Sequence, residues 1–114
     1  MDKFELYWGE IHNHNELGYA QGSLERSYDI ARSHLDFFAF TPHGMHADKG
    51  AGIFPVVERH WPEIQRAAAR HNDPGTFTCF LAYEWHSHAW GHVHVVYLED
   101  DQDLHFEPSL TALQ

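Results

Sequence analysis

The chain has 114 residues, of which 43% are hydrophobic and 15% aromatic, so it is expected to form one small domain with its own core. Seven basic residues against seventeen acidic ones give a formal net charge of −10. This charge argues against nucleic acid or an anionic membrane surface as the main partner. The single cysteine, Cys79, excludes an internal disulfide framework and a cysteine-based zinc knuckle.

The N-terminal segment carries charges where a signal peptide would need an apolar run. No stretch of the chain approaches the roughly 18 apolar residues of a membrane span. The sequence therefore predicts a cytoplasmic protein that has no membrane partner.

The first half of the chain predicts a strand, a helix and a second strand. Residues 4–11 are short and aromatic-rich, which is typical of a strand. Ser23 is a plausible N-cap for a helix over residues 24–35, whose apolar side chains recur at i, i+4, i+7 and i+11. Residues 36–41 predict a compact apolar strand, and residues 43–52 a glycine-containing loop long enough to carry a site.

The second half predicts another helix followed by two strands. Residues 56–71 repeat the helical stripe, and the turn-forming residues 72–75 follow it. Residues 76–85 and 92–98 read as strands, and residues 109–114 as a helix that has barely begun. The alternation of strands and helices predicts an α/β fold with a largely parallel sheet.

Chemically versatile side chains stand where the predicted strands end. His12 and His14 follow the first strand, His43 follows the second, and Glu84 closes the third. Because ligands of parallel α/β sheets gather at the carboxyl ends of the strands, we expect these four residues to share one site.

Histidine is unusually frequent, with 12 copies spread through the chain. Imidazole is the commonest metal ligand among side chains and the usual acid or base near neutral pH. The histidines favour short spacings, in the pairs His12 and His14, His43 and His46, His86 and His88, and His92 and His94.

His12 and His14 are separated by one residue, so in an extended segment their imidazoles project to the same side and can converge on one ion. The alternative is a polar pair at a strand end. For His43, the alternative to a ligand is a packed, hydrogen-bonded loop residue.

Glu84 is the most informative of these residues, because a carboxylate between Tyr83 and Trp85 is costly to bury unless it is paired or bound to a metal. A carboxylate can also bridge two ions. Four histidines follow Glu84 closely in the sequence and are either metal ligands or part of a solvated hairpin: His86, His88, His92 and His94. Of these four, we include His92 in the predicted ligand set.

Residues 7–14 (YWGEIHNH) resemble the opening motif of the polymerase and histidinol phosphatase (PHP) superfamily of metal-dependent phosphoesterases, in a functionally uncharacterised branch that opens with Tyr-Trp-Gly-Asp-Leu-His-x-His. Residues 35–43 resemble the second motif, residues 72–86 the third, and residues 91–98 the strand after it. These stretches cover most of the chain in the expected order.

The resemblance implies a partial (β/α) barrel of the PHP type, with about four strands and two to three helices. Residues 1–114 would then form a single domain, the N-terminal half of a larger barrel. Carried over, His12 and His14 hold one divalent ion (Zn, Mn or Fe), Glu84 bridges two and His43 binds a further one. Glu84 and His43 are thereby the expected catalytic residues, acting with metal-activated water on a small phosphorylated substrate.

The sequence departs from the family pattern in two places. Pro42 replaces the aspartate that precedes the second-motif histidine. The family's later ligands, a histidine after the fourth strand and a C-terminal Asp-x-His, have no counterpart, and His105 is the only late histidine.

Three functions remain open on these grounds. The first is a metal-dependent phosphoesterase-like hydrolase, or the N-terminal part of one. The second is a non-catalytic metal-binding or assembly module that retains the first-half ligands. The third, a histidine-rich metal buffer, is disfavoured because the candidate ligands stand at strand ends in an ordered α/β pattern.

Assembly is also expected, because four strands and two helices cannot close a barrel and leave open sheet edges. The apolar side chains are too many for so small a shell to cover: Phe37, Phe38, Phe40, Phe77, Phe80 and Val95. A symmetric dimer is the commonest solution. In such a dimer, a late histidine of one copy would complete the site of the other; the candidates are His92, His94 and His105.

Overall fold

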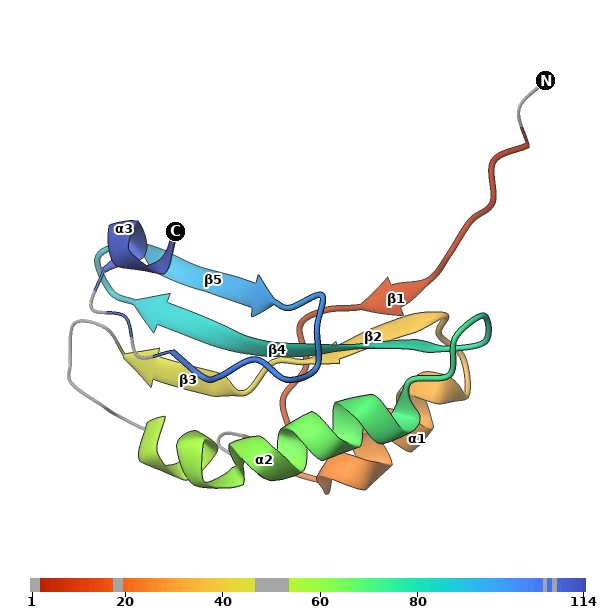
Figure 1. Cartoon of the computed structure of the whole chain (residues 1–114), viewed down its shortest axis with the longest axis horizontal. Coiled ribbons are helices and arrows are strands. Elements are labelled where there is room, and N and C mark those ends of the chain that lie inside the picture. Colours follow the sequence, from red (N-terminus) through yellow and green to blue (C-terminus); the bar gives the residue numbers. More distant parts are fainter. Residues whose placement is uncertain (1–2, 18–19, 47–53, 106, 108) are drawn as a thin grey trace.

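A computed structural model of the chain describes residues 3–17, 20–46, 54–105, 107 and 109–114. Helices pack beneath a twisted sheet, and the N-terminal arm extends away from it (Figure 1). In chain order the elements are β1 (Gly9–Glu10), α1 (Leu24–Arg32), β2 (Phe37–Phe40), β3 (His43–His46), α2 (Phe54–His71), β4 (Thr78–Ser87), β5 (Gly91–Val96) and α3 (Leu110–Leu113).

β4 is the central strand of the sheet. On one side β2 pairs in parallel with its first four residues, and β3 pairs in parallel further along, with His43 opposite Glu84. β5 is antiparallel on the other side, joined by the turn that follows Ser87. β1 pairs in parallel with β2, so the sheet is parallel except at β5. The predicted α/β class with a largely parallel sheet is confirmed.

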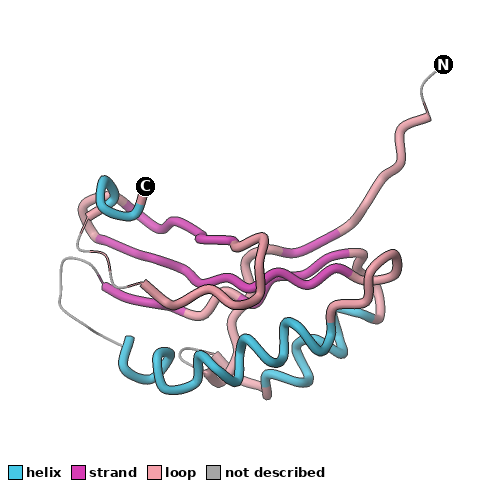
Figure 2. The backbone as a smooth tube through the Cα atoms, in the orientation of Figure 1, coloured by secondary structure: helices cyan, strands magenta, loops and turns pink. Residues whose placement is uncertain are grey.

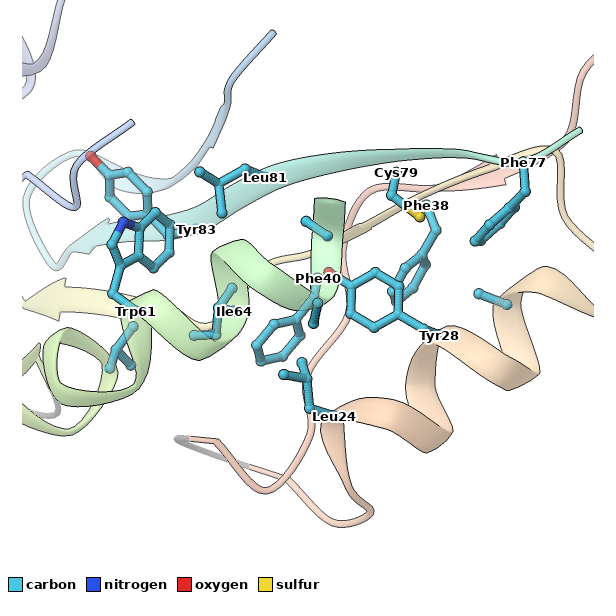
Figure 3. Close-up of a cluster of buried hydrophobic side chains, with 14 of the residues drawn as sticks. Leu24, Tyr28, Phe38, Phe40, Trp61, Ile64, Phe77, Cys79, Leu81 and Tyr83 are labelled. Atoms are coloured by element: carbon cyan, nitrogen blue, oxygen red, sulfur yellow. The ribbon is translucent and has the colours of Figure 1, made fainter. Parts of the chain in front are cut away.

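The helices α1 and α2 cover one face of the sheet, as the tube in Figure 2 shows. Because side chains alternate along a strand, every second residue of β2 and β4 points toward these helices. Figure 3 shows part of this core. Six of its buried side chains come from the two strands: Phe38, Phe40, Cys79, Leu81, Tyr83 and Trp85. Burial raises the pKa of the Cys79 thiol to about 12, so it is an inert part of the core.

The helix α1 begins where predicted and ends at Arg32, three residues before the predicted end. The Ser23 hydroxyl accepts a hydrogen bond from the Arg26 amide at 3.3 Å, which satisfies one of the free amides of the first turn. Leu24, Tyr28 and Ala31 are buried and form the predicted apolar face. The face therefore anchors α1 to the sheet.

The helix α2 spans Phe54–His71, slightly longer than predicted, and continues through Pro62, which lies on its exposed face. Its buried stripe contains Val57, Trp61, Ile64 and Ala68. No helix in the described ranges is both long enough and apolar enough to cross a lipid bilayer.

Two strand predictions are wrong. Of the described residues 4–11 only Gly9–Glu10 form a strand, because β2 begins at Phe37. The Trp8 carbonyl still accepts hydrogen bonds from the Asp36 and Phe37 amides at the start of β2. Residues 43–46, predicted as loop, form a strand, so the part of the sheet that the structure describes has five strands and not four. The rest of the predicted loop, residues 47–52, lies outside the described residues.

Candidate metal centre

Glu84 lies on the sheet face that the helices leave uncovered. Tyr83 and Trp85 belong to the core on the face that the helices cover, so alternation directs Glu84 and His86 to the opposite face. Glu84 was predicted to close its strand, but β4 continues to Ser87. The pairing of β4 with β3 and β5 extends it beyond the end of β2.

Four histidines surround the Glu84 carboxylate. Its Oε2 atom lies 3.4 Å from Nε2 of His12, 3.1 Å from Nε2 of His14 and 3.3 Å from Nε2 of His43. Its Oε1 atom lies 2.5 Å from Nδ1 of His92. The Nε2 atoms of His12 and His14 are themselves 3.1 Å apart. The structure therefore brings together all five residues of the predicted ligand set.

Different elements supply these residues. His12 and His14 lie in the coil after β1, and His43 is the first residue of β3, where its register places it opposite Glu84. His92 lies on β5, whose hairpin with β4 folds it back over the same face. The Pro42 carbonyl accepts a hydrogen bond from the Glu84 amide at 2.8 Å, so the residue that replaces the expected aspartate ties His43 to β4 through its backbone.

Two more histidines join the cluster. His94 is the cross-strand partner of Glu84, and its ring centroid lies 4.3 Å from that of His12. The ring of His86 lies 4.7 Å from that of His43. On the sequence alone, His86 and His94 could be either metal ligands or residues of a solvated hairpin. Their even spacing from Glu84 and His92 along the two strands is the signal that places them on the same face.

The other histidines singled out by the sequence lie elsewhere. His88 is exposed in the turn between β4 and β5. His105 is exposed and its carbonyl accepts a hydrogen bond from the Tyr83 hydroxyl at 3.5 Å, on the core side of the sheet. Within one chain, His105 therefore contributes nothing to the cluster.

The Glu84 side chain is only 1% exposed, and each ion-pair contact recorded for it in the described part of the chain is with a histidine. Burial opposes ionisation, but the contact with His43 and the charges of His43, His14 and His92 lower the pKa of Glu84 to about 2. Burial lowers the pKa of His14 and of His94. Near neutral pH the Glu84 carboxylate is therefore ionised and the imidazoles of His14 and His94 are neutral. These are the protonation states that bind metal.

The spacing of the donor atoms fits a divalent ion. Nitrogen and oxygen ligands lie about 2.0–2.2 Å from zinc, which separates neighbouring donors by about 2.8–3.6 Å in octahedral or tetrahedral geometry. The distances among His12, His14 and Glu84 are 3.1–3.4 Å. Within the described structure, neither Glu84 oxygen has a hydrogen bond of acceptable geometry.

Among the described residues, two groups of donors could hold a metal ion, and both include Glu84. The first comprises His12, His14 and Glu84, and the second comprises His43, Glu84 and His86. In each group the ligand atoms lie within 4.8 Å of one another. The donor set of imidazoles and one carboxylate suits zinc, manganese or iron.

A separate cavity of about 530 Å³ lies at the other end of the sheet, against Tyr7, Phe37 and Phe80. None of the clustered histidines lines it. The cavity therefore plays no part in the candidate metal centre.

The chain matches the family described as a protein of unknown function, DUF3604, over residues 29–111. The chain belongs to this family. The match includes Glu84 and four histidines of the cluster, while His12 and His14 precede it. No curated protein and no solved structure matches the chain.

Proposed function

We propose that the chain is a metal-dependent hydrolase of the phosphoesterase type, or the N-terminal part of one. The observation that carries this proposal is the buried Glu84 carboxylate, which is surrounded by imidazole nitrogens at the spacing of ligands around one ion. The resemblance of residues 7–14 to the PHP opening motif supports the phosphoesterase class.

His12, His14 and Glu84 hold the first ion in this proposal, and His43, Glu84 and His86 hold the second. Divalent ions at these positions supply water activation and stabilise negative charge that develops on a phosphoester. Glu84 belongs to both groups, so its fixed position on β4 sets the relation between them.

The exposure of the histidine side chains leaves the proposed site open to a small substrate. His14 and His43 are 17% and 14% exposed, whereas His12 and His92 are each 55% exposed. The inner ligands are thus fixed by packing, and the outer imidazoles face solvent. This openness leaves room for a small phosphorylated molecule, which is the substrate class that the PHP resemblance implies.

The first test is the metal content of the purified chain, measured by elemental analysis after equilibration with zinc or manganese. We expect at least one bound ion per chain in the wild type and a loss of tenfold or more in affinity for Glu84→Gln and His14→Ala. His34→Ala is the matched control, because His34 is exposed at the end of α1 and contacts the Ile30 carbonyl.

The second test is the hydrolysis of p-nitrophenyl phosphate by the same samples. Slow, metal-dependent turnover that disappears in His14→Ala supports the hydrolase. A wild type that binds no ion contradicts the metal centre itself. Stable metal binding without turnover of any phosphoester favours the alternative function, a non-catalytic metal-binding module.

A further inference from the structure

The histidine pair of the candidate centre stands on a segment with little support from the sheet. β1 pairs with β2 only through Gly9 and Glu10, and His12, Asn13 and His14 follow in coil. Because Asn13 lies between the two histidines, the orientation of its peptide groups determines where both rings point. Whatever holds Asn13 therefore holds the ligand pair.

Thr41 contacts the Asn13 backbone at three points. The Thr41 amide donates to the Asn13 carbonyl at 3.0 Å, and the Thr41 hydroxyl donates to the same carbonyl at 3.1 Å. The hydroxyl also accepts from the Asn13 amide at 3.0 Å. Thr41 is fully buried, so water does not compete for these bonds.

The position of Thr41 in the chain joins the sources of the ligands. Thr41 follows the last residue of β2, and the next residue, Pro42, accepts the hydrogen bond from the Glu84 amide. His43 comes next and faces Glu84. Residues 41–43 thus connect the coil that bears the histidine pair to the strand that bears the carboxylate.

We propose that Thr41 is a positioning residue, whose hydroxyl fixes the Asn13 backbone so that His12 and His14 converge on Glu84. The inference rests on the proposed metal centre. A merely structural role, in which the hydroxyl only satisfies buried polar groups, would affect folding and leave metal affinity alone. The metal affinity of a Thr41 variant therefore distinguishes the two roles.

The test compares Thr41→Val, which keeps the shape and removes the hydroxyl, with Thr41→Ser, which keeps the hydroxyl. Cobalt(II) is titrated into each metal-free protein, with the visible absorption of the bound ion as the readout. We expect at least tenfold weaker binding and an altered spectrum for Thr41→Val, and affinity within threefold of wild type for Thr41→Ser. Thr78→Val, six residues before Glu84 at the start of β4, is the control and should bind like wild type.

The outcomes separate the two proposals. If the wild type binds no cobalt, the metal centre and the role of Thr41 in it are both wrong. If the wild type binds and Thr41→Val binds equally well, only the role of Thr41 is overturned. Should Thr41→Val fail to fold, amide hydrogen exchange at Asn13 in the wild type decides: slow exchange supports the contact with the buried hydroxyl, and exchange at the rate of free coil overturns it.

Discussion

Gly44 lies against the ring of Tyr83 so closely that a Cβ atom on residue 44 would overlap the ring. Gly44 occupies the irregular step of β3 between His43 and Met45, where the register against β4 shifts. The glycine therefore allows β3 to approach β4 directly beside Glu84. The missing side chain at position 44 is part of what places His43 in the cluster.

Gly44→Ala is accordingly expected to destabilise the protein by about 1–3 kcal/mol, because Tyr83 is buried and cannot move aside without cost. Urea denaturation measures the change. The same variant should bind zinc more weakly than wild type, since displacement of β3 moves His43. Unchanged stability would show that the β3 backbone shifts freely at this point.

Substitutions in the cluster and in the turn beside it should differ in their effect on metal content. Because Glu84 belongs to both donor groups, Glu84→Gln is expected to lose more bound metal than His86→Ala, His94→Ala or His88→Ala. Elemental analysis of the four variants at one metal concentration gives the comparison. Loss in His86→Ala equal to that in Glu84→Gln would contradict a shared carboxylate.

Glu25 should make the stability of the fold depend on pH. It joins α1 to α2 through a contact with Arg70 and a 2.9 Å contact with Nε2 of His71. The hydrogen bond with His71, aided by Arg70, lowers the pKa of Glu25 below its ordinary value of 4.5. The unfolded state therefore binds the proton first. The stabilisation is complete above pH 4.5 and is lost as the pH falls through the pKa of the folded state.

The Glu25 side chain is 53% exposed, so solvent screening limits this contribution to about 0.5 kcal/mol. The free energy of unfolding of Glu25→Gln should fall below that of wild type at pH 7, and the two should converge at low pH. Glu58→Gln is the control, because Glu58 is an exposed residue on α2. A difference that persists at low pH would assign the effect to packing instead of charge.

We expect the chain to associate in solution, most simply as a dimer with an apolar interface. Phe4, Leu6 and Trp8 on the N-terminal arm are 97%, 74% and 65% exposed, and large exposed apolar surface drives association. Light scattering across micromolar concentrations measures the mass. A double variant, Phe4→Ser with Leu6→Ser, should shift it toward the monomer, and a wild type that is already monomeric would refute the expectation.

The sequence alone was enough to predict the helices. The serine cap at Ser23 and the stripe of Leu24, Tyr28 and Ala31 act within one or two turns, so the local pattern contains the information. The stripe of α2 is of the same kind. These features depend on neighbours three or four residues apart, so the local sequence is enough to predict them.

The principal ligand set was also predictable, for a topological reason. In a parallel sheet the carboxyl ends of strands lie at one edge, so residues after successive strands meet there. His12, His14, His43 and Glu84 follow this rule, although β4 extends past Glu84. Proximity therefore followed from strand order, without knowledge of the distances.

Only the tertiary structure decided the remaining features, because they depend on pairs of residues far apart in the chain. Residues 43–46 carry no strong strand signal and become a strand only by pairing with β4. The place of His94 follows from the antiparallel register of β5, which sets it opposite Glu84. The contact of Thr41 with Asn13 spans 28 residues. Hydrogen bonds between distant backbone segments form only when the whole sheet assembles, and no local pattern of side chains records them.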